Sequence, residues 1–137
     1  MNLEGTRFGS ITFNQDDIID FAEGLVGFPH AHRFVVLCTK DDSAFRWLQC
    51  IDDPTLAFLV AIPEHLIPEY APSVSKSQAE SLGLTPETPT LIFVTANIPK
   101  GRPRDMTLNL AGPIVVNGET QKARQLILED PNYSVKH

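Results

Sequence analysis

The sequence predicts a mostly β protein: a small antiparallel β-barrel-like or sandwich fold, formed by a single domain over residues 1–137, with one or two short helices. Three observations predict it. Runs of β-branched and aromatic residues recur at short spacing, separated by many of the 11 prolines and 8 glycines. An Asn-Gly pair lies between two strand-like runs near the C-terminus. Signals for helix are confined to two short segments.

The first predicted hairpin joins residues 34–38 to residues 45–51. Both runs are rich in β-branched and aromatic side chains. Between them, residues 40–43 read Lys-Asp-Asp-Ser, a composition typical of turns because Asp and Ser side chains hydrogen-bond to their own backbone. Residues 56–62, which follow a second Asp-rich break, predict a buried strand that ends at a proline.

Two helical segments are predicted in the middle of the chain. Residues 75–80, with the sequence Ser-Lys-Ser-Gln-Ala-Glu, contain two overlapping capping-box patterns, and Gly83 lies where a C′ glycine would end a helix. We therefore expect a helix of about two turns over residues 76–82. A single further turn is predicted over residues 63–67.

The last part of the chain predicts three more strands. Residues 91–95 form a β-branched and aromatic run that stops before a proline. Residues 113–116 and 119–121 flank Asn117-Gly118, and a two-residue type I′ turn needs the positive φ angles that Asn and Gly adopt most readily. We therefore expect a hairpin here with its turn at Asn117-Gly118.

The composition favours a protein that folds without disulfides or membrane insertion. The chain has 137 residues, of which 42% are hydrophobic, enough to build a core. Its two cysteines are too few for a disulfide framework, and its apolar runs fall far short of the ~18 residues of a membrane span. Since the N-terminus lacks a signal-peptide pattern, we expect a soluble cytoplasmic protein without a membrane segment.

Charge narrows the choice of partners. The net charge is −6, and the acidic residues are concentrated in residues 1–70, which carry a charge of −7 against +1 for residues 71–137. Nucleic-acid binding needs a basic face, so no direct nucleic-acid contact is expected. The acidic half instead favours attraction to a basic protein surface, or serves only to keep the protein soluble.

No motif for catalysis, metal or cofactor appears in the sequence. His30 and His32 would share one face of a strand, but no third ligand stands at a supporting spacing. The glycines of residues 24–27 lack the Lys-Ser/Thr sequel of a phosphate-binding loop, and no nucleophile elbow is present. We therefore expect a protein that is not an enzyme and holds no cofactor.

Several stretches along the chain together carry a resemblance to a known protein family. In chain order they are Thr6-Arg7-Phe8-Gly9-Ser10-Ile11, Ile18-Ile19-Asp20-Phe21, Glu23-Gly24-Leu25-Val26-Gly27-Phe28, Phe45-Arg46-Trp47-Leu48-Gln49-Cys50, Ala57-Phe58, Tyr70, Asn109-Leu110-Ala111-Gly112-Pro113-Ile114-Val115-Val116-Asn117, Gln125 and Tyr133. Taken together, these stretches resemble the flagellar assembly factor (FliW) family. The resemblance implies a barrel-like β fold in a cytoplasmic protein of flagellated bacteria, without catalytic activity.

The resemblance also implies two protein partners. One is flagellin, whose terminal region family members bind and protect before export. The other is the translational repressor CsrA, an RNA-binding dimer whose repression of flagellin mRNA family members relieve by binding away from the RNA-contact surface. Free flagellin would occupy this protein and leave CsrA active, and export of flagellin would release it to sequester CsrA. We expect the isolated chain to be a monomer.

The residues expected to bind partners are those that match the family motifs, and each has a structural alternative. The glycine loop either exposes Leu25 or Phe28 or tucks Phe28 into the core. Tyr70 suits an interface or a core. Asn109 could satisfy buried backbone groups, and Asn117 could make the turn. The full set is Gly24, Leu25, Gly27, Phe28, Tyr70, Asn109, Leu110, Pro113 and Asn117.

Two other function classes stay open on the sequence alone. One is a β-barrel that binds a small ligand or acts as an enzyme, with a pocket near His30, His32 and Asn109. The other is an RNA-binding module in the basic loop of residues 100–104, whose cations Lys100, Arg102 and Arg104 lack interleaved aromatic residues for base stacking. A solvated loop tip explains those cations more simply, and contact with an acidic partner is a further alternative.

Overall fold

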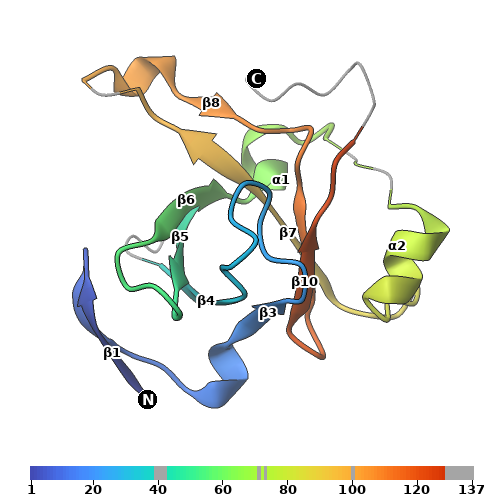
Figure 1. Cartoon of the computed structure of the whole chain (residues 1–137). Coiled ribbons are helices and arrows are strands. Elements are labelled where there is room, and N and C mark those ends of the chain that lie inside the picture. The colour runs from blue at the N-terminus through green and yellow to red at the C-terminus, as the bar shows by residue number, and fades with distance from the viewer. Residues whose placement is uncertain (39–42, 71, 73, 100, 129–137) are drawn as a thin grey trace.

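A computed structural model describes residues 1–38, 43–70, 72, 74–99 and 101–128 (Figure 1). The elements in chain order are β1 (Asn2–Thr6), β2 (Gly9–Thr12), the 3-10 turn η1 (Gln15–Asp17), β3 (Ile19–Phe21), β4 (Arg33–Leu37), β5 (Phe45–Cys50), β6 (Ala57–Ala61), α1 (Pro63–Leu66), α2 (Lys76–Ser81), β7 (Thr90–Asn97), the 3-10 turn η2 (Pro103–Asp105), β8 (Thr107–Leu108), β9 (Ile114–Asn117) and β10 (Lys122–Gln125).

Seven strands close into a barrel in the order β6-β5-β4-β3-β10-β9-β7, and β7 returns to pair with β6. Neighbours are antiparallel except β3 and β10, which run parallel with Phe21 opposite Ala123. Strand directions cannot alternate around a closed ring with an odd number of strands, so at least one neighbouring pair must be parallel. The predicted mostly β, barrel-like fold is confirmed, and the departure from antiparallel pairing follows from closure.

The barrel interior is filled by alternate side chains of its strands. Phe21 and Phe34 meet there edge to face, with ring centroids 5.3 Å apart. The buried residues of this inner cluster are Ile19, Phe21, Leu25, Ala31, Phe34, Leu48, Cys50, Val60, Phe93, Ile114, Val116 and Ala123. The barrel interior is therefore a packed core.

Two smaller apolar clusters cover the outside of the barrel. One joins Tyr70, Leu108 and Leu110 to the outward side chains Ala61 and Val94 of β6 and β7. The other lies beside α2, at the right of Figure 1, and buries Leu82, Val115 and Leu126. The segments between strands are thus fixed to the barrel by apolar side chains of their own.

Most of the predicted elements are confirmed. The first hairpin pairs β4 with β5, with Phe34 opposite Cys50, although residues 40–42 of its turn lie outside the described residues. The strand predicted over residues 56–62 is β6, the strand over 91–95 lies within β7, and the single turn over 63–67 contains α1. None of the helices in the described part of the chain is long and apolar enough to cross a membrane.

Helix α2 begins and ends as the sequence predicts. The Oγ of Ser75 accepts a hydrogen bond from the Gln78 backbone N–H, and the Gln78 side chain accepts one from the Ser75 N–H. At the other end Gly83 has a positive φ of 69°, and Leu84 N–H donates to the Ala79 carbonyl at 2.9 Å, which forms a Schellman motif. The first of the two overlapping capping boxes is therefore the one that starts the helix.

The turn predicted at Asn117-Gly118 is wrong in type. β9 and β10 do form a hairpin, but residues 118–121 form its loop, so residues 119–121 are turn rather than strand. Neither Asn117 nor Gly118 has a positive φ, whereas Gln121 has a φ of 62°. The physical reason is that the buried Asn117 side chain accepts hydrogen bonds from the N–H groups of Glu119 and Thr120, which holds a wider turn.

The N-terminal ribbon and the shortest strands were not predicted from the sequence. β1 and β2 pair with each other outside the barrel, and the ribbon contacts it through Phe8, whose ring meets Trp47 edge to face at 5.4 Å. The Arg7 guanidinium lies over the same Trp47 ring at 4.2 Å. β1 contains Asn, Glu and Gly, and β3 has three residues, so neither carries enough β-formers to predict a strand.

Candidate interaction surface

Residues 24–28 form a tight turn on the barrel surface. Leu25 and Phe28 exchange two backbone hydrogen bonds, of 2.8 and 3.2 Å. Within the four-residue β-turn of residues 25–28, Gly27 is the third residue, and its φ of 85° is the backbone conformation that a type II turn requires at that position. The side chain of Leu25 enters the inner core of the barrel, with 4% of its surface exposed. The turn is therefore anchored by Leu25.

The rest of the turn presents apolar side chains to solvent. Val26, at its tip, is 58% exposed, and Phe28 is 42% exposed. The inner side of the Phe28 ring meets Phe58 edge to face at 5.0 Å. Of the two alternatives drawn from the sequence, the structure thus shows a mixture, in which Leu25 is buried and Phe28 lies half on the surface.

Gly24 fixes the shape of this turn. Its φ is 69°, and a Cβ at this position would lie 2.8 Å from the Phe28 carbonyl oxygen and from backbone carbons of Pro29. Any side chain at position 24 would clash with the backbone of Phe28 and Pro29, so the turn could not keep this conformation. Gly27 differs, because a Cβ there would meet nothing within 4 Å.

Gln125 joins the turn to a second family motif. Its Oε1 accepts a hydrogen bond from the Val26 N–H, and its Nε2 donates to the Gly112 carbonyl, both at 3.0 Å. A Cβ on Gly112 would lie 2.8 Å from the Asn109 Nδ2, so the two residues are in close contact. The structure thereby brings together Gly24–Phe28 and Asn109–Gly112, which are far apart in sequence.

Beside the turn lies an open groove of about 410 Å³, between residues 23–29, the end of β10 and Gln78 of α2. On its rim Arg124 forms an ion pair with Glu23 at 3.4 Å. Ile127, which also lines the groove, is 69% exposed. The groove therefore combines exposed apolar side chains with one ion pair, a composition typical of a protein-binding surface.

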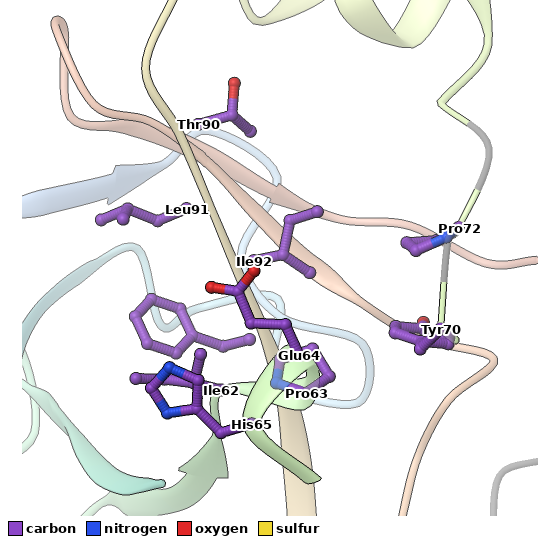
Figure 2. A pocket seen from close by; sticks show the side chains of 10 residues that line it. Ile62, Pro63, Glu64, His65, Tyr70, Pro72, Thr90, Leu91 and Ile92 are labelled. Carbon is purple, nitrogen blue, oxygen red and sulfur yellow. The ribbon is translucent and has the colours of Figure 1, made fainter. Parts of the chain in front are cut away.

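Tyr70 belongs to a different groove, of about 240 Å³, between α1 and β7 (Figure 2). Its ring is buried, and its hydroxyl donates to the Leu110 carbonyl at 2.6 Å. Glu64 and His65 of α1 line the groove, and the other lining residues are Ile62, Pro63, Pro72 and residues 90–93. Tyr70 thus forms part of a groove wall and holds Leu110 in place.

Asn117 and Pro113 have structural contacts. The Nδ2 of Asn117 donates to the Leu82 carbonyl at 2.8 Å, which ties the end of α2 to β9, and its Oδ1 holds the wider turn found in place of the expected type I′ turn. The buried Pro113 accepts a hydrogen bond from the Leu126 N–H at 2.8 Å. Asn109 differs from the expectation, because its buried Oδ1 has no hydrogen-bond partner among the described residues.

The cleft beside His30 is lined by neither His32 nor Asn109, the other two residues of the alternative ligand pocket. His30 lines a cleft of about 290 Å³ with Cys50, Asp52 and Asp53, while Asn109 packs against Gly112. His30 and His32 lie in a loop and not in a strand, and within the described residues no group of three or more His, Cys, Asp or Glu could hold a metal ion. Desolvation by burial raises the pKa of the Cys50 thiol, which keeps it protonated and poorly nucleophilic.

The basic loop is partly neutralised by its own acid. Arg102 forms an exposed ion pair with Asp105 at 3.5 Å, and Arg104 is exposed beside it. Lys100 lies outside the described residues. The described part of the loop therefore offers two cations and one carboxylate.

Sequence reasoning did not single out Val26, Arg124 or Ile127 as surface residues. The sequence did not separate Val26 from Leu25, because both apolar residues lie between Gly24 and Gly27 and only the fold shows that Leu25 is the buried one. Ile127 carried no signal either, since exposure beyond the end of a strand depends on where β10 stops.

The chain is similar to known proteins over nearly its whole length. The model of the FliW protein family matches residues 2–137. The chain is 39% identical over 130 residues to the flagellar assembly factor FliW of Magnetococcus marinus, covering 95% of this chain and 80% of the relative. It is 38% identical over 136 residues to that of Bdellovibrio bacteriovorus, covering 99% and 77%. A crystal structure of the flagellar assembly factor FliW superposes with a TM-score of 0.90 at 30% identity, covering 100% of this chain and 95% of that one.

Proposed function

Because this chain belongs to the FliW family of flagellar assembly factors, we propose that it acts by binding other proteins, with flagellin and the translational repressor CsrA as its two partners. It binds the terminal region of flagellin before export, and it relieves repression of flagellin mRNA by sequestering CsrA. The proposal assigns the chain no chemical reaction.

The observation that carries the proposal is the turn at residues 24–28. Its backbone is fixed by Gly24 and by the bonds between Leu25 and Phe28, and yet it presents Val26 and part of Phe28 to solvent. A rigid apolar projection loses little conformational entropy when it binds, which favours a protein contact. The open groove next to it adds the exposed Ile127.

Charge supports the choice of an RNA-binding partner. A repressor of translation must present a basic surface to RNA, and the acidic half of this chain would attract it and repel RNA phosphates. One pair of unit charges ~10 Å apart contributes only about 0.4 kcal/mol in water, so several must act together, and salt weakens them.

Four acidic residues in the segment that precedes the turn in sequence are candidates for this effect: Asp16, Asp17, Asp20 and Glu23. Two already have partners, because Asp17 accepts a hydrogen bond from the Asn14 N–H and Glu23 pairs with Arg124. Asp16 and Asp20 are exposed. We expect the double variant Asp16→Asn/Asp20→Asn to antagonise CsrA less well than the wild type at low salt, and equal antagonism would reject the electrostatic part of the proposal.

The two partners would compete for the protein in a partner switch. While flagellin accumulates in the cell it occupies this chain, and CsrA represses flagellin translation. Once flagellin is exported the chain is released and takes CsrA off the mRNA. Flagellin added to a preformed complex with CsrA should therefore displace CsrA.

Co-purification tests the proposal. The tagged wild-type chain should retain flagellin from a lysate of flagellated cells and, separately, purified CsrA. Val26→Asp should weaken retention, because a carboxylate at the tip of the turn cannot enter an apolar contact.

Ile98→Asp is the matched control, since Ile98 is exposed to a similar extent on another part of the surface. Retention of neither protein by the wild-type chain would overturn the proposed function. Equal losses of partner retention for Val26→Asp and Ile98→Asp would show that the turn is not the binding surface.

A further inference from the structure

The first half of β7 has a strand neighbour on one side only. Residues 90–93 pair with β9, whereas β6 reaches β7 only at Val94 and Thr95. β6 ends at Ala61, and the chain turns away from the sheet into α1 at Pro63. One edge of β7 is therefore left without a partner strand among the described residues.

Two residues direct their main-chain groups to that edge. Toward β9 and β8, the carbonyls of Pro89 and Thr95 accept hydrogen bonds from Gly118 N–H (2.7 Å) and Asn109 N–H (3.0 Å). Main-chain groups of successive strand residues point to opposite sides, so the N–H and C=O groups of Thr90 and Ile92 point to the open side.

The end of β6 explains why these groups stay open. The position opposite Ile92, if the pairing with β6 continued, is Pro63. Proline has no N–H to donate, and the Pro63 carbonyl already accepts a hydrogen bond from Ile67 N–H at 2.7 Å within the α1 turn. The start of α1 therefore stops the ladder at Ala61, the last residue of β6 that pairs with β7.

The groove of about 240 Å³ runs along this same edge (Figure 2). Four consecutive residues of β7, Thr90–Phe93, line it. Consecutive side chains of a strand point to opposite faces of the sheet, so a groove that touches all four lies along the strand edge. Its other walls are α1, Tyr70 and Pro72.

We propose that this groove binds an extended segment of a partner protein as an additional strand, hydrogen-bonded to the open main-chain groups of Thr90 and Ile92. In this mode of recognition the main chain supplies affinity and alternate side chains enter pockets beside the strand. The apolar wall of Ile62, Tyr70 and Pro72 suits an apolar side chain of the added strand.

Charge selects the kind of segment. The lining includes the Glu64 carboxylate and neither Lys nor Arg, so a segment with a Lys or Arg next to apolar residues is the complementary one. The inference rests on the proposed function for the partner itself. Of the two proteins proposed there, the RNA-binding repressor is the one that must carry basic surface, and purified CsrA is the probe.

The first test is a matched pair of variants. Thr90→Pro removes one N–H that faces the groove and no hydrogen bond to β9, because Thr90 is directed away from β9. Thr90→Val keeps that N–H while losing the same side-chain hydrogen bond to the Thr88 carbonyl. We expect Thr90→Pro to bind CsrA about tenfold more weakly than Thr90→Val, as for the loss of one hydrogen bond, with similar unfolding midpoints.

Amide hydrogen exchange is the second test and needs no variant. In the complex with CsrA, exchange at Thr90 and Ile92 should slow at least tenfold, whereas Leu91 and Phe93, already paired with β9, should change little.

Three results would overturn the inference. If the wild-type chain binds CsrA with no alternating protection and Thr90→Pro binds as well as Thr90→Val, strand addition is wrong while the proposed function stands. If flagellin alone protects these amides, the choice of a cationic segment is wrong. If the wild-type chain binds neither protein, the inference falls together with the proposed function.

Discussion

Two segments that resemble the family motifs use their residues in opposite ways. In Asn109–Asn117 the side chains of Leu110, Pro113 and Asn117 are buried, and their contacts hold strands and α2 together. In Gly24–Phe28 only Gly24 and Leu25 are buried, while Val26 and Phe28 face solvent. A match to a family motif therefore does not by itself separate residues that build the fold from residues that contact a partner.

The sharpest contrast lies inside the turn itself. Gly24→Ala should destabilise the protein by about 3 kcal/mol, since the added Cβ meets backbone atoms at 2.8 Å and the φ is positive. Gly27→Ala should cost about 1 kcal/mol, for the positive φ alone. Urea denaturation of both variants measures the difference. Equal costs would mean that the turn adapts, and that it is not the rigid projection described above.

The second contrast compares two asparagines of the buried segment. Asn117→Ala removes hydrogen bonds to Leu82, Glu119 and Thr120 and should cost about 2–3 kcal/mol of unfolding free energy. Asn109→Ala should cost less than about 1 kcal/mol, because its buried Oδ1 has no partner among the described residues. Thermal unfolding of the two variants decides the point, and a larger loss for Asn109→Ala would contradict the roles assigned here.

Tyr70 tests whether one residue can both stabilise the fold and contact a partner. Tyr70→Phe keeps the groove wall and leaves the buried Leu110 carbonyl without its donor, so it should destabilise the fold by about 1 kcal/mol. Partner affinity should stay within about twofold of the wild type, as measured by titration calorimetry. A large loss of affinity at unchanged stability would place the hydroxyl in the interface instead.

The smallest expected effect concerns Asp52, near the cleft beside His30. Partial desolvation raises the pKa of Asp52, but hydrogen bonds and charge from Arg33 outweigh it, so its pKa lies below the ordinary value. The Arg33–Asp52 ion pair therefore stabilises the folded protein fully above the pKa that Asp52 has in the unfolded chain. This stabilisation is lost as the pH falls through the pKa of Asp52 in the folded protein.

Asp52→Asn removes this pH dependence. Because the ion pair between Arg33 and Asp52 is partly exposed, the variant should lose only about 0.5 kcal/mol of unfolding free energy at neutral pH. It should unfold less steeply with acid than the wild type, as followed by circular dichroism from pH 6 to pH 2. An acid profile identical to that of the wild type would show that the ion pair does not form in solution.

The sequence predicted the strands that carry continuous runs of β-branched and aromatic residues and the helix that carries its own caps. β4–β7 and α2 belong to this group, because their signals are local. The sequence did not predict the elements whose conformation is set by tertiary contacts. The Asn117 turn is set by a buried side chain bonded to Leu82, and the strand β3, with three residues, exists because its neighbours complete the barrel.

The candidate interaction surface likewise has some features that the sequence predicts and others that it does not. The glycines of the turn could be recognised from the sequence, because their positive φ angles are local requirements. The proximity of Gln125 to Val26, and the open edge of β7, could not, since both depend on where distant strands end. Such features follow from closure of the barrel and not from any one segment.

The most direct test of the account is the affinity of purified flagellin and CsrA for the wild-type chain and for Val26→Asp, measured by titration calorimetry beside the unfolding free energy of each. The account predicts that both proteins bind the wild type, and that at least one binds Val26→Asp ten or more times more weakly at unchanged stability. Identical affinities for the two chains, or no binding to the wild type, would contradict it.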